Sequence, residues 1–226
     1  SDVLLTMDYN IQLKSEDVMR ALREKWRALS GLLLVTEPGT GRILALTGYP
    51  NFDPGQYGKE SNLRVFLNPA VESIYEFGSV IKPITMAAGI EEGLIGPETT
   101  YTDTGSAQFG SYVIRNFDGN AYGVQTMTQV LEKSLNTGAI FVANKLGKEK
   151  QIEYFKRFGF GEKTAIDLPG EITGNMANLS SWRPINYATA SFGQGIAVTP
   201  IQLAMAIGAI ANGGTLMKPY IVEKIT

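Results

Sequence analysis

The first fifty residues combine two periods of apolar positions. The segment 8–30 repeats apolar residues at helical spacing, namely Val18, Leu22, Trp26 and Leu29. Asp8 has the side chain of an N-cap, and Gly31 stands where a glycine commonly stops a helix. The pattern therefore predicts one helix between these two residues.

Two apolar, β-prone runs follow this helix. Residues 31–37 read GLLLVTE, residues 42–49 read RILALTGY, and the PGTG sequence between them consists of turn residues. Runs joined by such a short turn predict an antiparallel hairpin. The first run is apolar at nearly every position, which is typical of a strand covered on both faces.

Helical patterns dominate the second half of the chain. Thr126 and Gln129 have the spacing of a capping box. Thr199 and Gln202 repeat that spacing, with Pro200 at the first helical position. Helices are predicted for the segments 82–93, 126–133, 137–147, 148–159 and 199–214. The last of these is apolar on more than one face, which predicts a buried helix.

Strand signals are weaker between and after these helices. Residues 96–124 are polar and glycine-rich, with one strand candidate at 111–117, and a last candidate occupies 220–226. A hairpin among helices favours a mixed α/β fold of the α+β type, in which helices pack against an antiparallel sheet. Two strands form a poor sheet by themselves.

The absent residue types limit the chemistry. The 226 residues contain no histidine and no cysteine, which excludes imidazole bases, thiolate nucleophiles and disulfides. A formal net charge of −2 gives no sign of a nucleic-acid partner. Any reaction must therefore use serine, threonine, lysine, tyrosine, aspartate or glutamate.

No cofactor or metal site is predicted. The GTG sequence at 39–41 belongs to the hairpin turn and does not fit a nucleotide fingerprint. Asp103, Asp118 and Glu171 are scattered acids in predicted loops, without the spacing of a calcium or magnesium site.

The stretch YEFGSVIKP, residues 75–83, places a serine and a lysine at the start of a helix. Pro83 has no amide hydrogen and fits only near a helix start, so the helix begins close to Ser79. Ser79 and Lys82 are three residues apart and share one face. A neutral, partly buried Lys82 could take the proton of the Ser79 hydroxyl in place of histidine. Alone, the pair is also what chance predicts, and it fits a helix cap beside a solvated lysine.

A second short pattern favours the catalytic interpretation of Ser79 and Lys82 over the helix cap. Ser134 and Asn136 form the only S-x-N of the chain, in the segment LEKSLNTG between two predicted helices. By itself this pattern also fits a helix cap, because serine and asparagine are common loop residues. S-x-x-K followed by S-x-N is the order found in penicillin-interacting serine enzymes.

Over its whole length the chain resembles the transpeptidase domain of class B penicillin-binding proteins. The segments that carry the resemblance are LLTMDYNIQ, VTEPGTGRILALTGYPNFDP, YEFGSVIKP, SLNTGAIFVANKLG, FGFGEKTAIDLPGE and ASFGQGIAVTPIQLAMAIGAIANGG. The resemblance implies a fold similar to that of serine β-lactamases, with an antiparallel sheet flanked by helices and a mainly helical subdomain. Family members often have proline where this chain has Phe77.

The same resemblance implies a reaction. Ser79 would be the acylated nucleophile and Lys82 the base for acylation. Ser134 would relay a proton to the leaving amine, and Asn136 would bind the substrate amide and help to hold Lys82. The substrate would be the D-Ala-D-Ala end of a peptidoglycan stem peptide, and β-lactams would be trapped as acyl-enzymes.

The resemblance also implies a location and partners. Family members work at the extracytoplasmic face of the bacterial cytoplasmic membrane, in the periplasm or at the cell surface, with other proteins of cell-wall synthesis. They are anchored in the membrane. The apolar runs of this chain are too short to cross a bilayer, so the anchor is expected outside these residues.

The third motif of the family, K-T-G or K-S-G, is absent from the 226 residues. The resemblance therefore predicts a single transpeptidase-type domain that lacks its C-terminal part and some strands of its sheet. Residues 1–92 and 199–226 are expected on the sheet side, and residues 93–198 in the helical subdomain. An open edge of the hairpin would be sticky, so strands from another chain, or a rearranged segment, are expected against it.

Two other functions stay open from the sequence. The same acyl-serine chemistry serves DD-carboxypeptidases and serine β-lactamases, although the DLPGE and SFGQGIAVTPIQLA segments favour the class B synthases. The second alternative is a sensor or scaffold module that is acylated once or only docks partners. Turnover with a stem-peptide or thioester substrate would separate an enzyme from such a module.

Overall fold

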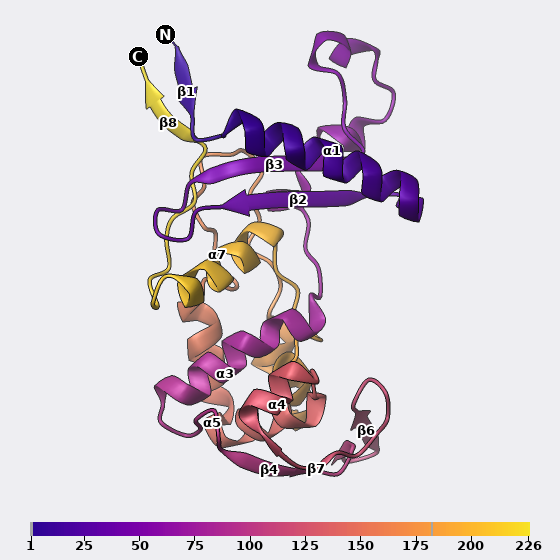
Figure 1. The fold of residues 1–226 in the computed structure, drawn as a ribbon, viewed down its shortest axis with the longest axis vertical. Helices are drawn as coiled ribbons and strands as arrows, with labels where there is room; N and C mark the ends of the chain where they lie inside the picture. The colour runs from indigo at the N-terminus through magenta and orange to yellow at the C-terminus, as the bar shows by residue number, and fades with distance from the viewer. Residues whose placement is uncertain (1, 182) are drawn as a thin grey trace. The chain divides into compact units, whose positions relative to one another are not determined.

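The structure is a computed structural model that describes residues 2–181 and 183–226 (Figure 1). The chain forms two compact units. The hairpin unit contains the chain up to Ile74, together with Glu162–Gly174 and Thr199–Thr226. The helical unit contains Tyr75–Gly161 and Asn175–Val198.

These bounds differ from the division expected from the sequence. Residues 75–92 were expected beside the sheet, but they belong to the helical unit, where Met86 packs in one core with Val142. Residues 162–174 were expected in the helical subdomain, but Ile166 packs in the core of the hairpin unit. The exchange follows the apolar contacts, which local sequence patterns do not reveal.

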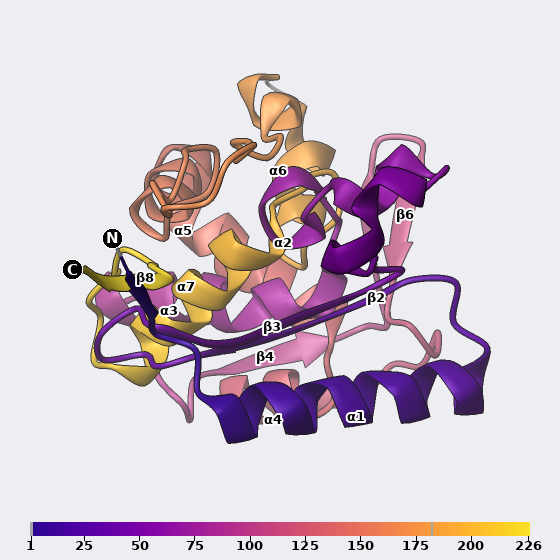
Figure 2. The same ribbon diagram turned by 90° about the horizontal axis from the view of Figure 1, so that it is seen from above.

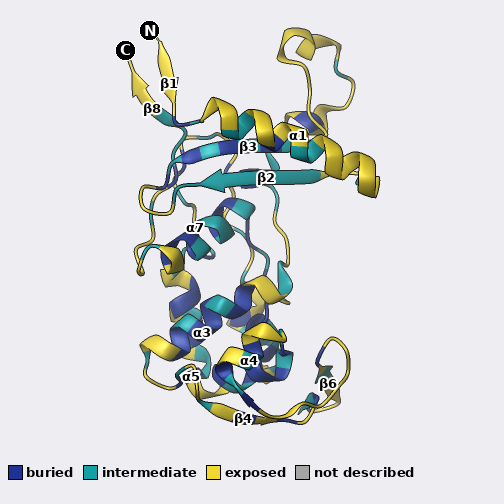
Figure 3. Cartoon of the chain, in the orientation of Figure 1, coloured by how far each residue is buried: buried dark blue, intermediate teal, exposed yellow. Residues whose placement is uncertain are grey.

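The predicted hairpin is confirmed. Strand β2 (Gly31–Thr36) pairs antiparallel with β3 (Ile43–Tyr49), with Leu34 opposite Leu46. As expected, other elements pack against both faces of β2, but the coverage is incomplete, because every residue of β2 is only half-buried (Figure 3).

Helix α1 (Tyr9–Trp26) lies along one face of this hairpin (Figure 2). As predicted, the Asp8 side chain caps it by accepting from the backbone N–H groups of Asn10 and Ile11. The helix ends earlier than expected, because Arg27 adopts a left-handed conformation with φ of 50°. Gly31 therefore begins β2 instead of stopping the helix.

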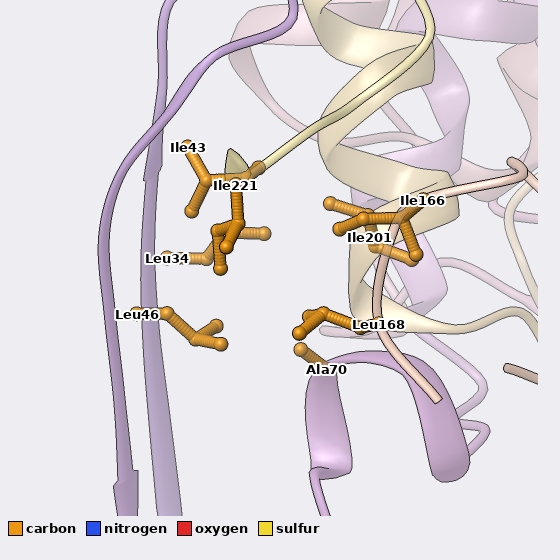
Figure 4. Close-up of a pocket in the computed structure, with 8 residues that line it drawn as sticks. All are labelled: Leu34, Ile43, Leu46, Ala70, Ile166, Leu168, Ile201 and Ile221. Atoms are coloured by element: carbon orange, nitrogen blue, oxygen red, sulfur yellow. The ribbon is translucent and has the colours of Figure 1, made fainter. Parts of the chain in front are cut away.

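The opposite face of the hairpin packs against α2 (Pro69–Glu72) and α7 (Pro200–Ala211), the predicted buried helix. Figure 4 shows the apolar side chains that meet there, which are Leu34, Ile43, Leu46, Ala70, Ile166, Leu168, Ile201 and Ile221. The space among these side chains does not admit a water molecule. This layer is a packed core and has no room for a ligand.

The two edges of the hairpin differ. On the outer edge of β3, the side-chain amide of Gln12 donates to the Leu46 carbonyl and accepts from the Leu46 N–H, as a neighbouring strand would. The N–H of Asp8 donates to the Leu44 carbonyl on the same edge. In the described part of the chain β2 pairs with β3 alone, so no rearranged segment occupies its outer edge.

Shorter elements complete the hairpin unit. Strand β1 (Val3–Leu5), which the sequence did not predict, pairs antiparallel with the predicted last strand, β8 (Val222–Ile225). The loop after β3 contains two 3₁₀ turns, η1 (Pro54–Lys59) and η2 (Leu63–Phe66).

The helical unit is built around one long helix. Its helical elements are η3 (Gly78–Ile81), α3 (Lys82–Glu91), α4 (Met127–Glu132), α5 (Asn136–Arg157), η4 (Ala177–Ser180) and α6 (Pro184–Ala190). Gly147, with φ of 73°, interrupts α5 and separates the two helices that the sequence predicted there. The core includes side chains from α3, α4 and α5.

Two small antiparallel sheets lie within the glycine-rich region of this unit. Strand β4 (Thr100–Asp103) pairs with β7 (Gly123–Thr126), and β5 (Ser106–Phe109) pairs with β6 (Tyr112–Arg115). The sequence predicted only the strand that became β6. Four-residue strands with polar side chains carry too little apolar alternation to be recognised.

Candidate active site

Ser79 lies on a tight turn that enters α3. Gly78 has φ of 62°, a left-handed value that glycine adopts without strain, and the turn η3 begins there. Pro83 occupies an early position of α3, as the sequence predicted. Ser79 itself is exposed.

A second segment holds this turn in place. Tyr75 and Val198 exchange two backbone hydrogen bonds, of 3.0 and 3.1 Å. The Gly78 N–H donates to the Gly193 carbonyl at 3.2 Å. Gly193 has φ of 78°, and a Cβ atom there would lie 2.2 Å from the Gly78 carbonyl oxygen. Only glycine fits so close to the residue that precedes Ser79.

Lys82 is buried, with 1% of its surface exposed. Its Nζ atom lies 3.1 Å from Ser79 Oγ, 3.0 Å from Ser134 Oγ and 2.6 Å from the Ser134 carbonyl oxygen. Burial lowers the pKa of Lys82 from 10.5 to about 8, because the charged form loses its hydration. The alternative in which Lys82 is a solvated charge is wrong.

These three contacts restrict where the lysine protons can be. A carbonyl oxygen only accepts, so one N–H of Lys82 must point at the Ser134 carbonyl. A neutral amine then keeps one N–H and one lone pair for the two hydroxyl groups of Ser79 and Ser134. The lone pair must face one of these hydroxyls, which is the geometry a base needs.

Ser134 reaches Lys82 through an unusual backbone conformation. It lies two residues beyond the end of α4 and has φ of 54°, in the left-handed region that non-glycine residues rarely occupy. The strain is held by local backbone bonds, since the Ser134 N–H donates to the Leu131 carbonyl. In this conformation both the carbonyl and the hydroxyl of Ser134 meet the same amine.

Asn136 is the first residue of α5. Its Nδ2 atom donates to the Arg115 carbonyl on β6 at 2.9 Å. The sequence resemblance implied that Asn136 also helps to hold Lys82, but in the described residues the hydrogen bonds of Lys82 go to the two serines. Asn136 is instead fixed by the small β5–β6 sheet, which the sequence did not reveal.

The helix-cap alternative is not what the structure shows for these residues. The residue that caps η3 is Phe77, which makes no side-chain cap, and Leu135 precedes α5 without one. Ser79, Lys82 and Ser134 instead form one hydrogen-bonded cluster, and Asn136 lies two residues from Ser134. The sequence missed the contribution of Gly193, although the SFGQG segment that contains it was noted.

Neither a cluster of metal ligands nor a membrane-spanning helix is present in the described residues. Within them, no three aspartate or glutamate side chains come together as metal ligands would. None of the helices formed by residues 2–181 and 183–226 combines the length and apolar character of a membrane span.

Comparison with known proteins places this cluster in a family context. A family model described as the penicillin binding protein transpeptidase domain matches residues 31–226. Stage V sporulation protein D of Bacillus subtilis is 38% identical over 224 residues, which are 99% of this chain and 35% of the relative. Penicillin-binding protein PbpB of Mycolicibacterium smegmatis is 32% identical over 224 residues, 99% of this chain and 34% of the relative.

A solved structure agrees over nearly the whole chain. Penicillin binding protein 3 of Mycobacterium tuberculosis, complexed with aztreonam, matches with a TM-score of 0.90 at 32% sequence identity. The match covers 98% of this chain and 49% of that chain. The chain thus spans about a third of the length of the curated relatives, at 35% and 34%. The α+β fold with short antiparallel sheets agrees with the expectation from the sequence.

Proposed function

Since the chain belongs to the penicillin binding protein transpeptidase domain family, we propose that it forms part of a serine DD-transpeptidase that cross-links peptidoglycan. The observation that carries this proposal is the buried amine of Lys82, 3.1 Å from the exposed hydroxyl of Ser79. Two curated relatives are named as peptidoglycan D,D-transpeptidases, at 30% and 29% identity.

In the proposed acylation, Ser79 Oγ attacks the carbonyl carbon between two D-alanine residues of a stem peptide. Lys82 takes the hydroxyl proton, and the Ser79 N–H would donate to the oxyanion, as amides in oxyanion holes do. The C–N bond then breaks. Ser134, hydrogen-bonded to Lys82, passes a proton to the departing amine, and Ser79 is left as an ester.

The second half of the proposed reaction reverses these steps. An amine on a neighbouring stem peptide attacks the ester carbonyl carbon, and the new C–N bond forms as the C–O bond to Ser79 breaks. Lys82 takes a proton from the amine and returns it to Ser79 Oγ. Asn136, on the rim of the cluster, would hydrogen-bond the substrate amide. A β-lactam would acylate Ser79 in the same way, but its opened ring stays attached, so no leaving group departs.

The setting is also part of the proposal. The family acts on peptidoglycan, which lies outside the cytoplasm, and we propose an extracytoplasmic site with a membrane anchor and other cell-wall synthesis proteins as partners. The 226 residues contain S-x-x-K and S-x-N but no K-T-G. A K-T-G strand, from the same or another polypeptide, would supply a further oxyanion donor, and losing one such donor typically costs about 10²–10³ in rate.

A covalent probe tests this proposal. The chain is incubated with a fluorescent penicillin, alone and with a segment that carries K-T-G, and the labelled peptide is mapped by mass spectrometry. We expect label on Ser79, slow for the chain alone and faster with the added segment. Ser79→Ala should abolish the label, while Ser61→Ala, which changes an exposed loop serine, should leave it.

Three outcomes would decide against the proposal. Full labelling of Ser79→Ala would remove Ser79 as the nucleophile. Fast release of the bound penicillin would indicate a β-lactamase, because a synthase stays acylated. Label without turnover of a thioester or stem-peptide substrate would favour the sensor module.

A further inference from the structure

A buried carboxylate lies beside the cluster without belonging to it. Asp103 ends β4 and is 2% exposed, so the sequence expectation of a loop acid is wrong. Its oxygens accept from the backbone N–H groups of Gly105 and Tyr122, at 2.9 and 3.0 Å. They also accept from Asn116 Nδ2, at 3.0 and 3.1 Å, and from Thr137 Oγ1, at 2.7 Å.

All of these donors are neutral. Burial by itself would raise the pKa of Asp103, but the hydrogen bonds from Thr137, Gly105, Tyr122 and Asn116 together lower it. The group is therefore ionised at neutral pH. A buried charge is costly unless every oxygen is satisfied, so this site fixes the position of each donor.

The proton directions in the network are determined. The Thr137 hydroxyl has one proton, and the ionised Asp103 can only accept it. Tyr101, whose hydroxyl lies 3.1 Å from Thr137 Oγ1, must then donate to Thr137. The Thr137 N–H also points toward Asn116 Oδ1, at 3.3 Å.

The network touches Asn136 from two sides. Thr137 follows Asn136 directly in α5, and Asn116 follows Arg115, whose carbonyl accepts from the Asn136 side chain. Asp103 thus binds the neighbour of the donor and the neighbour of the acceptor. A shift of either neighbour would move one end of the hydrogen bond between the Asn136 side chain and the Arg115 carbonyl.

We propose that Asp103 is a positioning residue that holds the Asn136 side chain in a fixed position relative to Ser134 and Lys82. The importance of this fixed position for catalysis rests on the proposed function. The position of the Asn136 side chain is a property of the folded chain and can be measured without a substrate.

The test compares two buried carboxylates. Asp103→Asn keeps the shape of the side chain but replaces an acceptor oxygen with a donor nitrogen, which opposes one of its present donors. The matched control is Glu171→Gln in the hairpin unit. Glu171 is 8% exposed and is also held by neutral donors, from Thr164 and Ala165.

The first readout is the pair of side-chain amide signals of Asn136 in a ¹⁵N–¹H NMR spectrum, assigned by their loss in Asn136→Ala. In Asp103→Asn we expect these signals to shift and their hydrogen exchange to accelerate. In Glu171→Gln they should be unchanged. Unchanged Asn136 signals in Asp103→Asn would overturn the inference.

The second readout is the rate of penicillin labelling at Ser79. Loss of a hydrogen-bond partner behind a metal ligand typically costs about 10- to 100-fold in activity, and by analogy we expect Asp103→Asn to slow labelling by a factor in that range. Glu171→Gln should label at the wild-type rate. Equal rates for the two variants would overturn the catalytic part of the proposal.

A second variant covers the case in which Asp103→Asn does not fold. Thr137→Val removes the hydroxyl that donates a hydrogen bond to Asp103 and keeps the shape of the side chain, so it should shift the same Asn136 signals. If wild-type protein fails to label while these signal changes occur, the proposed function fails and the positioning of Asn136 by Asp103 stands.

Discussion

Two helices of this protein begin in opposite ways. Helix α7 opens with a complete capping box, in which Thr199 accepts from the Gln202 N–H and Gln202 accepts from the Thr199 N–H. Helix α3 follows the turn at Gly78 and Ser79 and has no side-chain cap. Both have a proline in the first turn, so the difference lies in the polar side chains.

The same contrast recurs in the neighbouring pair. Helix α4 has a capping box, formed by Thr126 and Gln129, whereas α5 starts after Leu135 without a side-chain cap. The capped helices carry none of the four candidate residues. The uncapped starts carry Ser79 and Asn136, and at the start of α5 a residue from another segment, Asn116, accepts from the Thr137 N–H.

The largest effect should come from the base at the open start of α3. Lys82→Arg keeps a positive charge, but guanidinium does not lose its proton near neutral pH. Because general base catalysis is typically worth about 10²–10⁴ in rate, we expect labelling of Ser79 to fall by a factor in this range. The labelling rate is measured by stopping the reaction at successive times and quantifying the label on Ser79. A variant that labels within tenfold of wild type would show that Lys82 is not the base.

Gly193→Ala should give the next largest effect. Its Cβ would press on the Gly78 carbonyl and displace Ser79, and a displacement of about 1 Å can cost about 10²-fold in rate. The control is Gly213→Ala, which has φ of 86° but nothing within 4 Å of the new Cβ. Labelling at the wild-type rate by Gly193→Ala would mean that the turn does not depend on this contact.

The pH dependence should be moderate. With a pKa of about 8 for Lys82, the fraction of neutral amine should increase about tenfold between pH 7 and pH 9. The labelling rate should rise with it, with a midpoint near pH 8. A flat profile, measured with a penicillin that is stable over this range, would contradict a neutral Lys82 as the base.

The same titration affects folding. Unfolded chains keep the lysine proton up to about pH 10.5, so the unfolded state binds more protons than the native state above pH 8. The contribution of Lys82 to the free energy of unfolding therefore rises with pH between about 8 and 10.5. In urea titrations, the free energies of unfolding of wild type and Lys82→Met should approach each other as the pH rises. A difference that does not change with pH would contradict this expectation.

The smallest effect should be confined to stability. Thr199→Ala removes the cap of α7 and should lower the free energy of unfolding by about 1 kcal/mol, without changing the labelling rate of the folded protein. Ser79→Ala should do the opposite, with a stability change within about 0.5 kcal/mol. Thermal unfolding of both variants checks this. A slower label in Thr199→Ala would end the distinction between the two kinds of helix start.

The sequence was informative wherever the signal is local. The hairpin, the Asp8 cap, both capping boxes and the spacing of Ser79 and Lys82 depend on residues a few positions apart. The resemblance to a known family added the pairing of Ser79 with Ser134. The structure shows how they meet, through Lys82, which is 52 positions from Ser134.

Features that depend on distant contacts could not be predicted in this way. The close approach of Gly193 follows from its packing on Gly78, and the burial of Asp103 follows from donors on four segments. Neither of these has a periodic pattern. The division into two units was misplaced at residues 75–92 for the same reason.

The hairpin edge closed by Gln12 has a consequence for self-association. Because the Gln12 side chain and the Asp8 N–H occupy the backbone groups of Leu44 and Leu46, a further strand cannot pair with this part of β3. Further strands can be added only beside β2. Two molecules could join through their β2 edges, yet neither would then offer that hairpin to a third. Association through this hairpin would stop at a pair and would not continue into a fibril.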